Sequence, residues 1–321
     1  MPLRCRRELA GRRGLIDRGF AVLDYHLHLW SHDHSDVSLR LEQIAQYCEK
    51  AAAAGVVEIA LTEHLFRFVQ AEPIAAGLFD EEDPALRASM RRYWDYHARN
   101  DLDAYVEMAT AAKDAGLPVV VGLEVDHYRG RMDKVAELLD GYPFDVLLGS
   151  VHWIGAWQFD DLDSPLNMAE WSVRQVDASW DAYTEAIEEL AASGACDVLA
   201  HPDLIKVAGF VPDHPEECWD RLAEAAASSG MAAEVSSAGW RKRCLEQYPS
   251  RGLLDRLAER NVGFTTASDA HGLDRVADRT DDLRQMLSSV GIDQLVAFRG
   301  RRPRAVPLSP VSMTAPPEAR R

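Results

Sequence analysis

The stretch Ala21–His34, which reads AVLDYHLHLWSHDH, decides how the rest of the chain is interpreted. An apolar run at residues 21–23 leads into a polar end that contains His26 and His28. Successive side chains on a strand point to opposite faces, so these two imidazoles point to the same face. Two imidazoles side by side at a strand end are typical ligands of zinc and of transition metals. A half-buried strand with surface histidines is the alternative for this motif alone, so the metal hypothesis depends on the rest of the chain.

Composition indicates a globular, acidic protein. The chain has 321 residues, of which 47% are hydrophobic, and its net charge is −17. Such a charge repels phosphate backbones and disfavours nucleic acid as a partner. Five cysteines, an odd number without a CxxC pair, predict reduced thiols and a cytoplasmic protein. No apolar run approaches the roughly 20 residues of a membrane helix, so we expect no membrane partner. The oligomeric state is left open.

Three regions are predicted along the chain. Residues 1–19 are rich in arginine but lack the apolar stretch of a signal peptide, which predicts a disordered basic extension. A nucleic-acid-binding arm is the less favoured alternative for this region. Residues 20–300 form one domain, and the proline-rich residues 301–321 are expected to be a disordered tail.

Within the domain, seven β-type segments alternate with helical segments. The strands are predicted at 21–23, 56–61, 118–123, 144–149, 196–200, 231–235 and 262–266. Such alternation means parallel pairing with crossover helices. The glycine fingerprint of a dinucleotide-binding sheet is missing from the sequence, which favours an α/β fold closed into a distorted seven-stranded (β/α)7 TIM-like barrel. Barrels of this kind carry their sites at the carboxyl ends of the strands.

One connection is too long for an ordinary loop. Residues 65–104 are predicted to be a lid-like insertion over the barrel mouth, first as a loop and then as a helix. Its acidic run at 80–83 is interpreted as a solvated loop tip, with contact to a substrate amine as the alternative.

Metal-ligating residue types follow six of the seven predicted strands. They are His26, His28 and the nearby His34, then His64, Glu124, His152, His201, Asp269 and His271. A single histidine at a strand end is usually a loop residue, but nine N and O donors at one barrel mouth predict a metal site. Nine donors suit two or three divalent ions. His32, two residues before His34, is an alternative ligand at that position.

Seven motifs at these strand ends carry a resemblance to a known family. They are DYHLH (24–28), TEH (62–64), GLE (122–124), GSVH (149–152), HPDLIK (201–206), EVSSAGWRK (234–242) and SDAH (268–271). Together they resemble the PHP (polymerase and histidinol phosphatase) family, in its histidinol-phosphatase branch. The resemblance implies a trinuclear site for zinc, iron or manganese. The sequence departs from the family-like ExNTSGLRK segment, which here reads EVSSAGWRK.

The resemblance also implies how the ligands are shared among three ions. His26, His28, Glu124 and Asp269 would hold the first ion. Glu124 would bridge to a second ion, which His152 and His201 complete. The third ion would take His34, His64 and His271.

The expected chemistry is hydrolysis of a phosphate ester. A water molecule between two cations has a strongly lowered pKa, and the resulting hydroxide can attack phosphorus. Asp269 or His271 could then protonate the leaving oxygen.

Arg241 is the best candidate to bind the phosphate, because it follows the one strand end without a ligand and a guanidinium binds phosphate bidentately. A solvated basic run at 241–243 is the alternative for Arg241. Lys206 is a weaker second candidate for substrate binding.

The predicted function is therefore a metal-dependent phosphomonoesterase, with histidinol-phosphatase as the favoured activity and a small phosphorylated molecule as substrate. One alternative is a phosphoesterase of the same family that acts on another small phosphate, such as a nucleoside monophosphate. A nuclease or proofreading module is a further alternative, which the net charge of −17 disfavours. A non-catalytic metal-binding domain would not need an open trinuclear site.

Overall fold

The computed structural model describes residues 22–31, 40–80 and 82–308. The basic extension at 1–19, His32, His34 and residues 309–321 lie outside the described residues, so the predictions made for them stay predictions.

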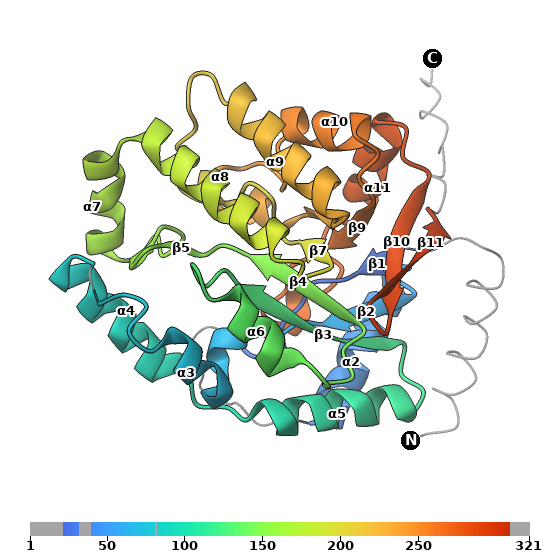
Figure 1. The fold of residues 1–321 in the computed structure, drawn as a ribbon. Helices are drawn as coiled ribbons and strands as arrows, with labels where there is room; N and C mark the ends of the chain where they lie inside the picture. The colour runs from blue at the N-terminus through green and yellow to red at the C-terminus, as the bar shows by residue number, and fades with distance from the viewer. Residues whose placement is uncertain (1–21, 32–39, 81, 309–321) are drawn as a thin grey trace, which may run out of the picture.

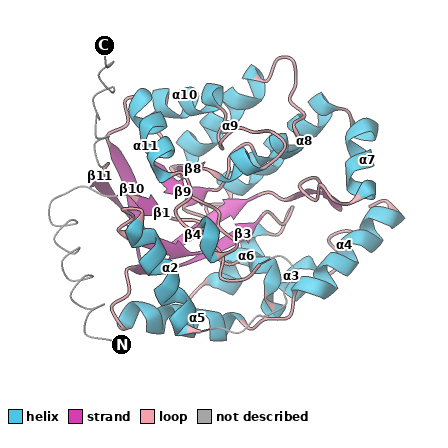
Figure 2. Ribbon diagram, turned by 180° about the vertical axis from the view of Figure 1, so that it is seen from behind, coloured by secondary structure: helices cyan, strands magenta, loops and turns pink. Residues whose placement is uncertain are grey.

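Seven parallel strands form the barrel, in the order β1-β2-β3-β4-β7-β8-β9. Their bounds are β1 (Leu23–Asp24), β2 (Glu58–Leu61), β3 (Val119–Asp126), β4 (Val146–Ser150), β7 (Val198–Leu199), β8 (Ala232–Ser236) and β9 (Phe264–Ala267). Backbone hydrogen bonds join the first strand to the last, since Tyr25 N lies 2.9 Å from Thr266 O and His28 N lies 2.7 Å from Ala270 O. The sheet is therefore nearly closed, and the predicted (β/α)7 barrel is confirmed. Figure 2 shows the strands gathered at the centre with helices around them.

Helices cover the outside of the barrel (Figure 1). They are α2 (Leu41–Ala53), α5 (Leu102–Asp114), α6 (Met132–Leu139), α8 (Val176–Ala192), α9 (Glu216–Ser229), α10 (Arg251–Glu259) and α11 (Thr280–Ser289). Close packing of α8 depends on Gly149 in β4, because a Cβ there would meet Leu190 Cδ2 at 2.9 Å. None of the helices in the described parts of the chain is both long enough and apolar enough to cross a membrane.

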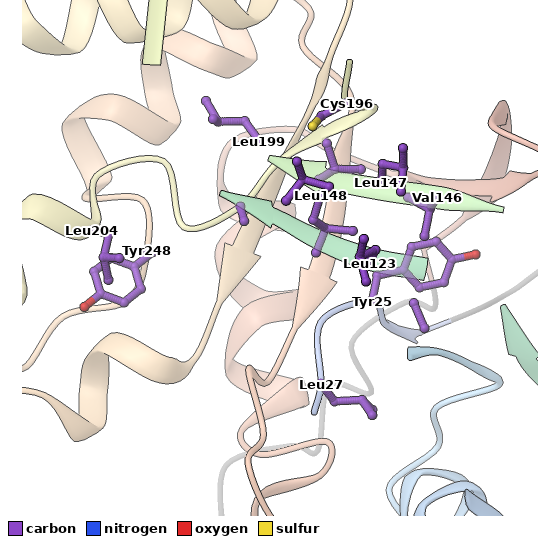
Figure 3. Close-up of a cluster of buried hydrophobic side chains, with 14 of the residues drawn as sticks. Tyr25, Leu27, Leu123, Val146, Leu147, Leu148, Cys196, Leu199, Leu204 and Tyr248 are labelled. Atoms are coloured by element: carbon purple, nitrogen blue, oxygen red, sulfur yellow. The ribbon is translucent and has the colours of Figure 1, made fainter. Parts of the chain in front are cut away.

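Strand β3 contributes residues both to the apolar core and to the polar mouth of the barrel. All eight of its residues are buried, and apolar side chains of β3 and β4, among them Leu123 and Leu147, belong to the buried cluster drawn in Figure 3. Glu124 and Asp126 are two residues apart and so share a face of the strand. They pair in register with Leu148 and Ser150 of β4. Strand alternation thus places two carboxylates near the end of β3 where the strand leaves the barrel.

Two connections at the mouth contain regular structure of their own. The 65–104 segment contains η1 (Leu65–Arg67), η2 (Val69–Ala71), α3 (Glu72–Ala75) and α4 (Pro84–His97). The segment after β4 contains β5 (Trp153–Ile154), β6 (Trp157–Gln158) and α7 (Pro165–Arg174). Both long helices start with a capping side chain followed by proline, Asp83 before α4 and Ser164 before α7. This is a common helix start signal, and α4 agrees with the helix predicted for the second part of the 65–104 segment, whereas η1, η2 and α3 lie in the part predicted to be a loop.

The prediction of a disordered tail from residue 301 is wrong for its first residues. β10 (Gln294–Arg299) and β11 (Arg302–Pro307) form an antiparallel hairpin. Among the described strands, β11 pairs with β10 alone, and proline is tolerated on such an edge strand. Figure 1 shows the hairpin on the opposite side of the barrel from α4 and α7.

The hairpin covers the barrel end where the strands begin. Arg304 pairs with Glu58 at the start of β2, at 3.0 Å, and Arg301 pairs with Asp197 before β7, also at 3.0 Å. Asp145, just before β4, is buried and accepts hydrogen bonds from Val121 N and Gly300 N, each at 3.0 Å. It also accepts one from Lys113 Nζ, at 2.6 Å.

We therefore expect Asp145→Ala to lower the free energy of unfolding by about 1–3 kcal/mol, because two backbone N–H groups lose their acceptor. Chemical denaturation measures this change. Asp114→Ala, which removes an exposed carboxylate at the end of α5, is the control and should stay within about 0.5 kcal/mol of the parent chain. Equal stability of the two variants would contradict the bracing role of Asp145.

Candidate metal centre

The structure brings the described predicted ligands together at the carboxyl end of the barrel. They are His26, His28, His64, Glu124, His152, His201, Asp269 and His271. Most of these side chains are buried, and Asp269 and His271 keep 16% and 20% of their side-chain surface exposed. The predicted convergence of strand ends on one mouth is therefore observed for every described member of the set.

Glu124 lies at the centre of the cluster and divides it in two. Its Oε2 atom faces three imidazoles: His26 Nε2 at 3.1 Å, His28 Nε2 at 3.5 Å and His64 Nδ1 at 2.7 Å. Its Oε1 atom faces two more imidazoles, His152 Nε2 at 3.3 Å and His201 Nε2 at 3.0 Å. A carboxylate with one oxygen toward each group of nitrogens has the arrangement needed to bridge two cations.

Asp269 and His271 complete the cluster from the segment after β9. Asp269 Oδ1 lies 3.4 Å from His28 Nε2, and His271 Nε2 lies 3.5 Å from His64 Nε2. Asp269 has a φ of +49°, in the left-handed region that non-glycine residues rarely adopt. Its backbone N–H donates to His26 O at 2.8 Å, which holds this conformation against the first strand.

Three further carboxylates stand behind the imidazoles, and the sequence interpretation gave them no role. Glu234 Oε2 lies 2.7 Å from His26 Nδ1, and Asp126 Oδ1 lies 2.7 Å from His152 Nδ1. Glu63 Oε2 lies 3.6 Å from His28 Nδ1. Such partners fix the ring orientation and tautomer of metal-binding histidines. Asp126 could have been found from its period-2 spacing to Glu124, whereas Glu234 required knowledge of how β8 packs beside β1.

The donor set fits divalent cations. When Nδ1 of His26 and of His152 donates to its carboxylate, the Nε2 lone pair of each ring points at Glu124. Lone pairs and carboxylate oxygens at 3.0–3.5 Å repel one another unless positive charge lies between them. Donor atoms about 2.1 Å from a shared tetrahedral ion would lie roughly 3.4 Å apart, in agreement with these separations.

The electrostatics of the cluster also attract positive charge. Burial alone would lower the pKa of His26, but the carboxylates of Glu234 and Glu124 outweigh burial and raise that pKa well above its ordinary value. Burial acts on Glu124 in the opposite direction and by itself would raise the pKa of this carboxyl group. The facing imidazoles, His64 first, outweigh burial and bring the pKa of Glu124 well below its usual range. A field that holds protons on buried imidazoles also favours divalent cations.

Groups of three donors lie close enough to share an ion. They are His28/His64/His271, His26/Glu124/His201, His26/His28/Asp269 and His64/Asp126/His152, with the donor atoms of each group within 4.8 Å of one another. The third group matches part of the first-ion set that the resemblance implies. The assignment of individual residues to individual ions stays a proposal.

A cavity of about 310 Å³ opens onto the cluster. Beside the candidate ligands, its walls include Phe66, Tyr93, Asp160, Leu204, Val207, Arg241, Lys242, Tyr248 and Arg275. Phe66 and Tyr93 belong to the 65–104 segment, which therefore forms one wall of the mouth. Its role as a lid stays a prediction.

Asp80 and Glu82 of the acidic run line a different cavity, together with His127, so the alternative of a substrate contact for this run gains no support.

Arg241 lies at the cavity, at the end of η4 (Ala238–Arg241), as its position in the sequence predicted. Its guanidinium is partly engaged, because Nη1 donates to Asp278 Oδ2 at 2.7 Å and Nη2 donates to Ser268 O at 2.8 Å. Lys242, the next residue of the basic run at 241–243, is exposed and also lines the cavity.

Lys206 does not reach the cavity, and the structure argues against a substrate-binding role for it. Its side chain is 1% exposed, on η3 (Leu204–Ala208). Nζ donates to Glu246 Oε2 at 2.8 Å, to Gln247 O at 2.7 Å and to Ser250 Oγ at 2.7 Å. These bonds use its three N–H groups. The sequence could not show this, because the acceptors lie 40 to 44 residues further along the chain.

Comparison with known proteins adds a family to this geometry. Residues 26–238 match the model of the PHP domain. A curated relative, "Probable histidinol-phosphatase" from Deinococcus radiodurans, is 30% identical over 287 residues, which cover 88% of this chain and 98% of that protein.

Solved structures support the fold. The crystal structure of a histidinol phosphate phosphatase from Lactococcus lactis, complexed with zinc, L-histidinol and phosphate, has a TM-score of 0.63 at 19% identity. The match covers 89% of this chain and 99% of that one. The chain belongs to the PHP domain family.

Proposed function

We propose that this chain is a metal-dependent phosphomonoesterase that hydrolyses L-histidinol phosphate to L-histidinol and phosphate. The observation that carries the proposal is Glu124, whose two oxygens face two separate groups of buried imidazoles at the barrel mouth. The substrate follows the curated relative, which is named for this activity and is matched over 98% of its length. The four described cysteines are free thiols, which agrees with a cytoplasmic enzyme.

The proposed metal content is two or three divalent ions of zinc, iron or manganese. The described residues that would hold them are His26, His28, His64, Glu124, His152, His201, Asp269 and His271. His34 or His32 would supply a further donor from outside the described residues. Bound ions supply positive charge for the phosphoryl oxygens and lower the pKa of water.

The protein's own groups hold this site in place and orient the substrate. Glu234 and Asp126 fix the tautomers of His26 and His152, so that both rings present Nε2 to the cluster. Asp269 and His271 are its most exposed described members. They are therefore the proposed proton donors to the leaving oxygen, in competition with their role as ligands. Arg241 is the proposed phosphate-binding residue at the cavity wall.

The substrate itself is the first point to test. We expect the protein, purified without chelator, to release phosphate from L-histidinol phosphate with kcat/KM at least about 100-fold higher than from nucleoside monophosphates or sugar phosphates. A phosphate-release assay over this panel measures the ratio, and chelation followed by metal return is the control. A nucleotide as the best substrate would contradict the histidinol phosphate assignment.

Glu124→Gln tests the bridging carboxylate. We expect turnover to fall at least about 100-fold, since one substitution weakens two ion sites that stabilise the transition state. Elemental analysis should find two or three ions per parent chain and fewer in the variant. Glu137→Gln removes an exposed carboxylate from α6 and should change neither measurement. Activity within threefold of the parent, at equal metal content, would rule out the bridging role.

Arg241→Ala tests phosphate binding. We expect kcat/KM for L-histidinol phosphate to fall roughly 10- to 200-fold, the value of a charge-assisted hydrogen bond of about 1.5–3 kcal/mol. Arg241→Lys should recover only part of the loss, because an ammonium cannot form the bidentate contact. Arg243→Ala is the matched control, since Arg243 belongs to the same basic run but donates to Leu162 O outside the cavity. Steady-state kinetics in which Arg241→Ala behaves like Arg243→Ala would contradict this role.

A further inference from the structure

One acidic side chain in the metal cavity stands apart from the candidate ligand cluster. Asp160 lies between β6 and α7 and lines the cavity with its side chain half-buried. The other acidic residues of the cavity wall, Glu124 and Asp269, both face imidazoles of the cluster. Asp160 belongs to none of the donor groups within reach of a shared ion among the described residues. Its carboxylate is therefore not needed to explain the metal site.

The surroundings of Asp160 leave its charge without a partner. Among residues 22–31, 40–80 and 82–308, no side chain forms an ion pair or hydrogen bond with this carboxylate. The positive charges that act on it most strongly belong to His152 and Lys242. Lys242 is exposed at the cavity rim, and His152 is already bonded to Asp126 at 2.7 Å. A half-buried carboxylate that stays unpaired in the free protein is available to a cationic ligand.

The cavity therefore offers groups that attract both signs of charge. The candidate metal cluster and Arg241 would attract the dianionic phosphate. Asp160 supplies a negative charge beside Tyr93, whose pKa is raised well above its ordinary value by burial and then by the charge of Asp160. A substrate that carries a phosphate and an ammonium group on one short carbon chain matches this combination of charges. L-histidinol phosphate is such a molecule, with a primary amine next to the phosphorylated carbinol.

We propose that Asp160 is a specificity-determining residue that binds the ammonium group of the substrate. This inference rests on the proposed function and adds the residue that distinguishes amino-alcohol phosphates from other phosphomonoesters. The contact forms with the intact substrate and persists with the product amine, because neither the carboxylate nor the ammonium takes part in P–O cleavage. Its loss should therefore appear mainly in KM.

A pair of substrates isolates this contact. L-histidinol phosphate carries the amine, and 3-(imidazol-4-yl)propyl phosphate lacks it but keeps the imidazole, the alkoxide leaving group and the phosphate. For Asp160→Asn we expect kcat/KM to fall about 10- to 100-fold on the first substrate, through KM, and to stay within about twofold on the second. Inhibition by L-histidinol should weaken by the same factor as KM rises.

Asp163→Asn is the matched control, because it removes an exposed charge from the same connection, outside the cavity wall. It should leave both substrates unaffected. Equal losses on the two substrates in Asp160→Asn would assign Asp160 to the leaving group or the metal site and overturn the inference. Unchanged kinetics on L-histidinol phosphate would overturn it as well. A parent protein that hydrolyses other phosphates but not L-histidinol phosphate would instead overturn the proposed function, and this inference with it.

Discussion

Closure of the barrel between β1 and β9 is the constraint on which the metal centre depends. β1 is only two residues long, so its few backbone bonds to the β9 segment are supplemented by the Asp24 side chain. That carboxylate accepts from Ser268 N at 2.7 Å and from Ala277 N at 2.9 Å. These contacts bring His26 and His28, which follow the first strand, against Asp269 and His271. Without closure, the cluster would be split into two halves at opposite edges of an open sheet.

Both ends of the barrel bury carboxylates, and the two ends neutralise them differently. At the end where strands begin, Glu58, Asp145 and Asp197 meet arginine and lysine side chains or backbone N–H groups. These partners are permanent, so this end is a structural brace. At the other end, Glu124 and Asp269 meet only imidazoles among the described residues. A neutral imidazole carries no charge of its own and can bind a metal ion through its free nitrogen. The mouth is therefore suited to divalent cations, which can exchange with the solvent.

The carboxylates behind the imidazoles make the mouth rigid before any substrate arrives. Glu234 and Asp126 are buried and pair with single histidine nitrogens at 2.7 Å, which sets the direction of each ring. Burial raises the pKa of Asp126 to about 6, although its bond to His152 opposes this. The protein thus keeps a desolvated carboxyl group close to the metal cluster. Burial of this group costs solvation free energy, and in return the candidate ligands are held in a fixed orientation.

The sequence by itself determined the alternation of strands and helices and the candidate ligands at the strand ends. These features depend on local periodicity and on the rule that parallel strands end on one side, so neighbouring residues suffice to predict them. Only the tertiary structure decided that Lys206 is buried among acceptors, that Arg241 shares its guanidinium with Asp278, and that Glu234 stands behind His26. It also decided that residues 302–307 form a strand, against their proline-rich composition. The three side-chain contacts join residues that are 37 or more positions apart in the sequence. The strand at 302–307 depends on pairing with β10 in the folded protein. A local sequence pattern does not encode which distant groups meet.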